Sequence, residues 1–327
     1  MTLRLTVRRL EWTAHVRATA AAYGSALLPV VKGNGYGFGR TVLHEVAAGL
    51  ATQVCVGTVH EVHDVPAGLQ PVVLTPTLHP PAAGGARQGP AAVLTVGHAA
   101  HVAALRGRPG PVVLKLGSSM RRYGVEPNDL PALQTAATDA GLEVVAYALH
   151  LPLAGTDAHR RAEIESWLAR LPADGVPLWV SHLSPESFHA LAAAHPHRPL
   201  RIRVGTALWH GAPRGDFLHL SADVQALRPV RGGEAAGYRL TPIPHDGTLV
   251  MVGCGSSHGV APLAHDDPAR RSPFHFRRHR LHLLEPPHMH TSMCIVPEGG
   301  PVPDLGDIVD VQQPLINVRT DDTVWLP

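Results

Sequence analysis

The sequence predicts an α/β fold in which a TIM (β/α)8 barrel, residues 1–215, is followed by a C-terminal all-β domain, residues 216–327. Two observations predict this division. Between about residue 25 and residue 205, short apolar runs alternate with Ala- and Leu-rich stretches, which is typical of repeated βα units around a parallel sheet. After Gly215 the apolar runs follow one another with Pro/Gly turns between them, which is typical of a β domain.

Eight apolar runs are the expected barrel strands. They lie at residues 27–32, 53–56, 71–74, 92–96, 111–116, 142–148, 177–180 and 200–204. Stretches long enough for the intervening helices lie at 40–49, 99–106, 130–140, 159–171 and 185–194. Because the active sites of TIM barrels form at the carboxyl ends of the strands, the residues that follow these runs are the first candidates for function.

The β domain is expected to contain six further strands. These lie at residues 220–229, 237–242, 248–252, 280–284, 291–296 and 308–311. We find no internal repeat and no linker of low complexity between the two parts of the chain, so the two parts are expected to pack closely.

The composition excludes several classes of protein. With 45% hydrophobic and 17% charged residues, the chain differs from disordered sequences. A net charge of +2 does not indicate a nucleic-acid partner, and no apolar run approaches the roughly 18 residues that a membrane span needs. Three widely spaced cysteines and an N-terminus without a secretory pattern lead us to expect a cytoplasmic protein without a disulfide framework.

The small number of lysines indicates candidate reactive residues. Of the 28 basic residues, 26 are arginine, and the two lysines are Lys32 and Lys115. An ammonium group can lose its proton and attack a carbonyl, which a guanidinium does not do in a protein. Two lysines retained in so arginine-rich a chain are therefore candidates for positions where an amine is required.

Lys32 ends the first predicted barrel strand, in the run PVVKGNGYGFG at residues 29–39. A lysine at the mouth of a barrel strand, followed by a glycine-rich loop, suits a Schiff base beside a phosphate. The run resembles the VVKANAYGHG motif of the alanine racemase family, whose cofactor is pyridoxal 5'-phosphate. The resemblance implies that Lys32 forms the Schiff base and acts as one acid/base group, and that Tyr36 binds the cofactor phosphate.

The run KLGSSMRRYG at residues 115–124 resembles the family's KxDTGMxRxG. By this resemblance, Arg122 binds the cofactor's phenolic oxygen and faces the substrate carboxylate. Lys115 corresponds to a lysine that is carbamylated in several members, and its state here is left open. Gly117 stands where the family has aspartate, so the local hydrogen bonding is expected to differ.

Two further runs resemble the family in the same order along the chain. YALH at residues 147–150 resembles the strand whose histidine supports the cofactor-facing arginine, which implies that role for His150. RVGTALWHG at residues 203–211 resembles RPGIALYG and implies that Arg203 faces the pyridine nitrogen. An arginine there keeps the nitrogen unprotonated, so the ring is a weaker electron sink, which suits racemisation better than transamination.

A phosphate group needs several convergent donors. The expected donors are the amides of Gly205 and Thr206 and one hydroxyl, for which we prefer Ser187 over Ser184. Both serines also suit the N-cap of a helix.

The resemblance is weaker in the β domain. Where the family has GYADG, with a tyrosine as the second acid/base group, this chain has GSSHG at residues 255–259. Ser256 stands in the tyrosine's place, and a serine hydroxyl is a poor base. Neighbouring Cys254 and His258 are alternative candidates, because thiolate and imidazole groups titrate closer to neutrality.

A second departure lies in HMHTSMC at residues 288–294, which resembles the family's RVSMD run. Met293 matches a methionine that contacts substrate from the partner subunit. His288, His290 and Cys294 have the ligand types of a metal site, but we expect no metal, because a chain with 23 histidines produces such spacing by coincidence. The end of the chain also lacks the tyrosine-bearing segment that closes the family's cofactor pocket.

The resemblance implies a homodimeric, pyridoxal-phosphate-dependent racemase that interconverts L- and D-alanine or a similar small amino acid. Two alternatives stay open. One is another pyridoxal-phosphate enzyme acting on D-amino acids, a one-base lyase or dehydratase that is metal-assisted in some forms. The other is a catalytically silent homologue that binds the cofactor without exchanging the substrate α-proton.

Overall fold

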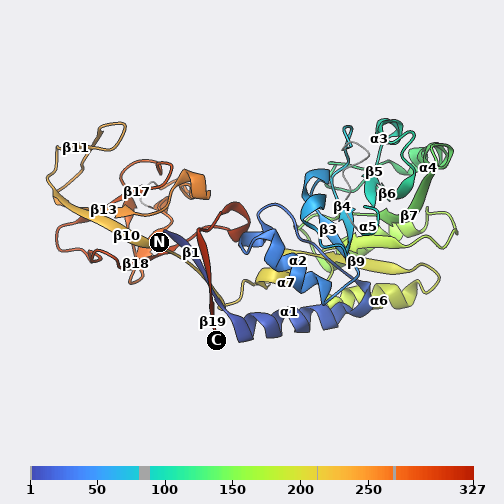
Figure 1. The fold of residues 1–327 in the computed structure, drawn as a ribbon, viewed down its shortest axis with the longest axis horizontal. Coiled ribbons are helices and arrows are strands. Elements are labelled where there is room, and N and C mark those ends of the chain that lie inside the picture. The colour runs from blue at the N-terminus through green and yellow to red at the C-terminus, as the bar shows by residue number, and fades with distance from the viewer. Residues whose placement is uncertain (1, 81–88, 212, 268–269) are drawn as a thin grey trace. The chain divides into compact units, whose positions relative to one another are not determined.

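The computed structural model describes residues 2–80, 89–211, 213–267 and 270–327 (Figure 1). Contacts between residues divide the chain into two compact units. We call them the barrel unit, His15–Gly35 and Arg40–Gly211, and the β unit, Met1–Ala14, Tyr36–Gly39 and Ala212–Pro327. The contacts therefore place the first residues of the chain with the β unit, whereas the boundary expected at residue 215 places them with the barrel.

Among the described residues of the barrel unit, eight strands overlap the eight predicted runs. They are β2 Leu27–Pro29, β3 Gln53–Val56, β4 Gln70–Val73, β5 Leu94–Val96, β6 Gly110–Lys115, β7 Leu142–Ala148, β8 Leu178–Ser181 and β9 Leu200–Val204. Six pair in the order β2-β9-β8-β7-β6-β5, and β3 pairs with β4. Parallel bridges Val30↔Cys55 and Val72↔Val93 close the ring. The prediction of a TIM barrel is confirmed.

Helices cover the outside of this barrel (Figure 1). They are α1 Arg9–Tyr23, α2 Arg40–Ala48, α3 Ala99–Ala104, α4 Leu130–Asp139, α5 Asp157–Leu168, α6 Pro185–Ala194 and α7 Thr206–His210. Helix α1, which begins in the β unit, was not predicted. Its buried residues Trp12, Val16 and Tyr23 recur at helical spacing. A short 3-10 helix, Val59–Asp64, follows β3.

The β unit contains a mainly antiparallel sheet and, among its described residues, a separate two-stranded sheet of β11 and β12. Its strands are β1 Leu3–Arg8, β10 Leu218–Val230, β11 Ala235–Ala236, β12 Thr241–Pro242, β13 Gly247–Val252, β14 Phe274–Phe276, β15 His279–Arg280, β16 His282–Leu283, β17 Ser292–Pro297, β18 Ile308–Val311 and β19 Asp322–Leu326. The prediction of an all-β second part is confirmed. Of the strand expected at 237–242, the structure has only the last two residues, β12, because Gly237 and Leu240 adopt positive φ in the turn between β11 and β12.

Strand β1 joins residues from opposite ends of the chain. It pairs with β10 in antiparallel orientation and with β19 in parallel orientation. Its alternate residues Leu3, Leu5 and Val7 are fully buried, as expected for a strand with one face on a core. This first strand is therefore part of the β unit's core.

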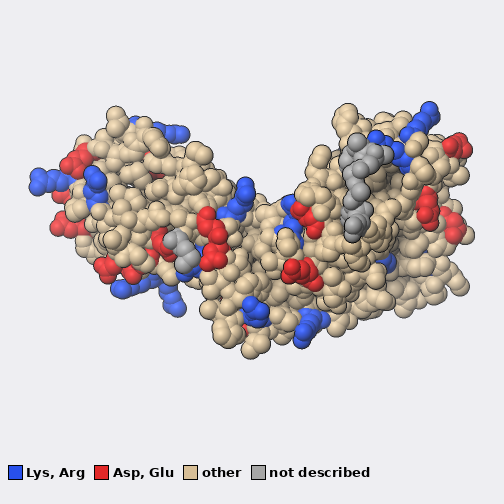
Figure 2. All heavy atoms as spheres, viewed as in Figure 1, with Lys and Arg blue, Asp and Glu red and all other residues tan. Residues whose placement is uncertain are grey.

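Charged side chains of both signs are interspersed on the visible face of each unit, without an extended area of one sign on that face (Figure 2). Within the described residues, none of the helices combines the length and the apolar content that crossing a membrane requires.

We expect Leu5→Ala to lower the free energy of unfolding by about 2–5 kcal/mol, because it leaves a cavity under the β1 strand. Chemical denaturation of the whole chain measures this effect. The matched control is Thr6→Ala on the opposite face of the same strand, where the change should stay below about 1 kcal/mol. Equal effects of the two variants would contradict the placement of β1 in the core.

Candidate active site

The predicted site residues of the barrel unit gather where the parallel strands end. Lys32 lies three residues beyond β2, Lys115 is the last residue of β6, and Arg203 lies near the end of β9. Since all eight strands run in the same direction, these positions meet at one end of the barrel. The charge of Arg203 acts on the pKa of Lys32 and on that of Lys115, as expected for groups at one end of the barrel.

Lys32 is exposed at this end of the barrel. The partial burial of its amine lowers the pKa of Lys32 below its ordinary value, and the positive charges of Arg122 and Arg203 lower it further. Glu61 and Cys55 act in the opposite direction. An accessible amine with a lowered pKa is a better nucleophile at neutral pH.

Lys115 differs from Lys32 in its burial, since only 5% of its surface is exposed. Burial lowers the pKa of Lys115 well below its ordinary value, and Arg203 and Arg122 lower it further. Burial and the two arginines thus act on the Lys115 pKa in the same direction.

Arg203 has 8% of its surface exposed. Its Nη2 donates to the Leu149 carbonyl oxygen over 2.8 Å. Its Nε is buried and has no hydrogen-bond partner among the described residues. An unsatisfied guanidinium N–H inside a barrel is costly unless a ligand accepts a hydrogen bond from it.

His150 follows β7 and is held in its neutral form. Its Nδ1 lies 2.9 Å from Ser181 Oγ. Burial, followed by the charges of Arg203 and Lys115, lowers the pKa of His150 to about 2. The structure thus places His150 beside Arg203, and its hydrogen bond goes to Ser181.

His182 directly follows β8 and was not predicted as a site residue. Its ring centroid lies 5.0 Å from that of His150. Burial and the charges of Arg160, Arg203 and Lys32 lower its pKa to about 4. Its φ of 63° is unusual for a residue with a Cβ. Its place after a barrel strand was the one sequence signal for it.

Arg122 is exposed, and its guanidinium lies over the Tyr123 ring at 5.2 Å. The loop that carries it is held from helix α5. Both Ser119 N and Ser119 Oγ donate to the Glu163 carboxylate over 2.7 Å, and Trp167 Nε1 donates to the Gly117 carbonyl over 2.8 Å. Glu163, which the sequence analysis missed, therefore fixes the loop in which glycine replaces the family's aspartate.

The two candidate serines for the phosphate lie at the start of α6. Ser184 is the N-cap, because its Oγ accepts from Ser187 N at 3.2 Å. Ser184 N and Oγ also donate to Asp157 Oδ2 over 2.9 and 2.6 Å. Burial raises the pKa of Asp157, but hydrogen bonds from Ser184, Ser187 and Arg160 outweigh it and hold this pKa below its usual range. Both serines therefore bond to Asp157, with Ser184 also serving as the cap, and the preference for Ser187 at the phosphate stays a prediction.

Gly205 and Thr206 begin the short helix α7 directly after β9, and Thr206 is exposed. Amides in the first turn of a helix have no acceptor within it. These two residues therefore lie at the end of the barrel expected for phosphate binding. Tyr36 lies in a 3-10 turn with φ 55°, is buried, and belongs by its contacts to the β unit, so its role at the phosphate stays a prediction.

In the β unit, the candidates for the second acid/base group differ in exposure. Cys254 is fully buried, and burial together with Asp321 raises the pKa of its thiol. His258 is buried, accepts from Gly255 N at its Nδ1 over 3.1 Å and lies 3.1 Å from Asp321 at its Nε2. Ser256 is exposed, in a turn held by Ser256 N donating to the His288 carbonyl over 2.7 Å. The structure therefore presents Ser256 to solvent and encloses the other two.

The run at residues 288–294 is spread over two environments. His288 pairs with the buried Glu285, and Cys294 is fully buried in β17. Met293 is half-buried beside the small core of Ile243, Leu249 and Ile295. In the described part of the chain no three His, Cys, Asp or Glu residues are arranged to hold a metal ion.

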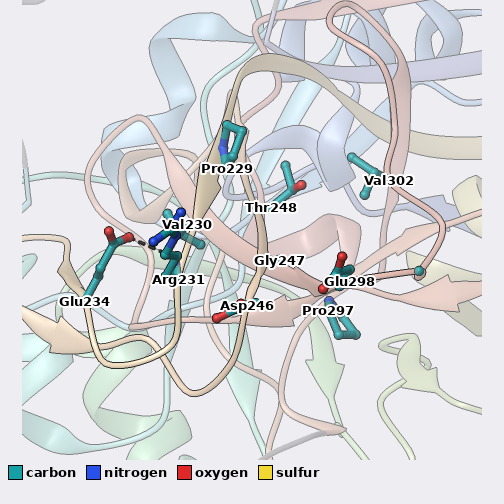
Figure 3. A pocket seen from close by; sticks show the side chains of 11 residues that line it. Pro229, Val230, Arg231, Glu234, Asp246, Gly247, Thr248, Pro297, Glu298 and Val302 are labelled. Atoms are coloured by element: carbon teal, nitrogen blue, oxygen red, sulfur yellow. Dashed lines mark hydrogen bonds between the residues drawn. The ribbon is translucent and has the colours of Figure 1, made fainter.

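A hollow of about 440 Å³ lies on the β unit (Figure 3). Arg231 and Glu234 line one side of it, where Arg231 N donates to the Glu234 carboxylate over 2.9 Å. Asp246 and Glu298 add further negative charge to the lining. None of the predicted site residues line this hollow.

Comparison with known proteins identifies the family. The model of the family described as alanine racemase, N-terminal domain, matches residues 10–213. The chain belongs to the alanine racemase family. It is 31% identical over 268 residues to the alanine racemase of Mycolicibacterium vanbaalenii, covering 72% of this chain and 67% of that relative. It is 29% identical over 265 residues to the Mycobacterium tuberculosis enzyme, with the same coverage of 72% and 67%.

Solved structures of alanine racemases share the fold. The Bartonella henselae enzyme, described as having covalently bound pyridoxal phosphate, matches with a TM-score of 0.71 and 18% identity over 100% of both chains. The biosynthetic enzyme of Pseudomonas aeruginosa matches with a TM-score of 0.68 and 20% identity over 100% of this chain and 99% of that one. The family resemblance read from the sequence is confirmed.

Because His150 and His182 are held neutral, they oppose folding in acid. In the unfolded chain both imidazoles bind a proton below about pH 6.5. In the folded protein His182 does so only near pH 4 and His150 only near pH 2. The free energy of unfolding should therefore fall as pH falls, by up to about 1.4 kcal/mol per pH unit for each imidazole.

Between pH 6.5 and 4.5, we expect His150→Asn to reduce the pH dependence of the free energy of unfolding by the contribution of one imidazole, about 1.4 kcal/mol per pH unit. Denaturation of the cofactor-free protein at several pH values measures this change. An unchanged slope in His150→Asn would contradict a neutral His150.

Proposed function

We propose that this protein is a pyridoxal 5'-phosphate-dependent racemase that interconverts L- and D-alanine, or a similar small amino acid, through a Schiff base at Lys32. The observation that carries the proposal is the buried Arg203 Nε without a partner, beside an accessible lysine whose pKa is lowered. Such a site needs an acceptor at Arg203 and an electrophile at Lys32, and a pyridine ring that bears a carbonyl offers both.

The residues present fit this cofactor. Lys32, Lys115, Arg122 and Arg203 concentrate positive charge at the strand ends, where they influence one another's pKa values. A phosphate and a phenolate offset such charge. Arg203 would hold the ring nitrogen, Arg122 the phenolic oxygen, and Gly205, Thr206 and Ser187 the phosphate.

When bound, the cofactor supplies an electron-withdrawing ring that makes the α-proton of an attached amino acid acidic. The Lys32 amine then takes or returns that proton on its own face of the substrate. The Arg122 guanidinium suits the substrate carboxylate, because its planar fork matches two carboxylate oxygens. Neutral His150 supports Arg203 without adding a further positive charge beside it.

Inversion of the α-carbon also needs a proton donor on the opposite face. We propose that the turn at residues 255–259 supplies that side, with Ser256 as its exposed hydroxyl. In the homodimer that the family resemblance implies, this turn and Met293 come from the partner subunit. A serine hydroxyl transfers protons poorly, so we expect slower turnover than a tyrosine would support.

The test is α-proton exchange of L- and D-alanine in deuterated water, together with the visible absorbance of the cofactor-loaded protein. We expect a visible band and exchange from both enantiomers. In Lys32→Ala the band should disappear and exchange should fall at least about a thousandfold. Lys32→Arg is the matched control that keeps the charge, and it should behave like Lys32→Ala.

The other outcomes separate the alternatives. Exchange from one enantiomer alone would replace the racemase by a one-base lyase or dehydratase. A band without exchange would indicate a silent cofactor-binding homologue. If no band formed with added cofactor, the proposed function would be wrong.

A further inference from the structure

The main chain directly after Lys32 is held by two side chains. Gly33 N donates to Glu61 Oε1 over 3.2 Å, and the Gly33 carbonyl accepts from Arg40 Nη1 at 2.6 Å. Arg40 is itself fixed by Asp64, to which its Nε donates over 2.5 Å. Both polar main-chain groups of the residue that follows Lys32 therefore have partners.

The same Glu61 carboxylate reaches the neighbouring strand. Its Oε2 accepts from Gly57 N at 2.7 Å, and Gly57 directly follows β3. The main-chain link between β2 and β3 ends where Val31 N donates to the Cys55 carbonyl over 2.8 Å. Glu61 extends this link beyond its last main-chain bond, because one carboxylate bridges the two glycines that follow the strands.

The Glu61 carboxylate is packed closely against Gly57. A Cβ added to Gly57 would lie 3.0 Å from Glu61 Oε1, so the carboxylate fills the space beside Gly57. Gly33 itself has a φ of 61°, a conformation that glycine adopts without strain. Glu61 thus fixes the position from which the Lys32 side chain leaves the barrel wall.

Glu61 also supplies negative charge beside Lys32. Arg122 and Arg203 lower the pKa of the Lys32 amine, whereas Glu61 and Cys55 raise it. Burial raises the pKa of the Cys55 thiol to about 11, so that thiol is neutral at physiological pH. We therefore attribute the opposing effect at that pH to the Glu61 carboxylate.

We propose that Glu61 is a positioning residue for Lys32, whose carboxylate fixes the main chain beside the amine and offsets the two arginines that face it. The inference rests on the proposed role of Lys32 in binding the cofactor. It assigns to Glu61 no contact with substrate or cofactor.

The first test uses the cofactor-free protein and amide hydrogen exchange. Glu61→Gln keeps the shape but retains one acceptor oxygen for two donors, so exchange at Gly33 or Gly57 should quicken by about tenfold or more. The matched control is Glu45→Gln on α2, an exposed carboxylate that should leave both amides unchanged. Unchanged exchange in Glu61→Gln would overturn the proposal, whether or not the cofactor binds.

The second test follows the rate at which the visible band appears, as a function of pH, after pyridoxal 5'-phosphate is added. Without the carboxylate the Lys32 amine loses its proton more easily, so the midpoint in Glu61→Gln should move to lower pH by about 0.5 unit or more. Glu61→Asp, which keeps the charge with a shorter reach, should keep the midpoint near that of the unmodified protein. A midpoint that does not move in Glu61→Gln, in a protein that forms the band, would overturn the electrostatic part of the proposal.

Discussion

Positive charge held close together at the carboxyl ends of the barrel strands is the constraint on which the site depends. Lys115 and Arg203 are buried there, and Lys32 and Arg122 lie beside them. Their mutual repulsion and burial lower the pKa values of both lysines and hold His150 and His182 neutral. A polar interior of this kind is stable when anionic groups enter it. The chemistry proposed for the protein follows from that requirement, because a phosphate and a carboxylate are the anions that these residues suit.

The scaffold fixes these charges with few side chains. Glu61 bridges the ends of β2 and β3, and Glu163 holds the loop that carries Arg122. Both carboxylates come from segments that follow barrel strands, so the same βα connections that complete the fold also position the cations. In the β unit, the ion pair of His258 and Asp321 connects the turn at residues 255–259 to the segment just before β19. Asp321 at Nε2 and the Gly255 N–H at Nδ1 engage the two ring nitrogens of His258, and Ser256 is left exposed.

The barrel was predictable because parallel strands buried on both faces are continuous apolar runs, which stand out in the sequence. Strands β1 and β19 were missed because their pairing joins residues from opposite ends of the chain, which no local pattern reveals. The cations of the site were found through motifs, whereas Glu61, Glu163 and His182 were not. Their roles depend on how far a side chain reaches across neighbouring strands. The exposure of Ser256 and the burial of Cys254 likewise depend on the tertiary fold.

The proposed chemistry requires that Lys32 meets the cofactor while Lys115 stays enclosed. Since the chain has two lysines, borohydride reduction of the protein loaded with pyridoxal 5'-phosphate, followed by peptide mass spectrometry, distinguishes them directly. We expect a stable pyridoxyl adduct on the peptide that contains Lys32 and none on the peptide that contains Lys115. An adduct on Lys115, or on neither lysine, would contradict it.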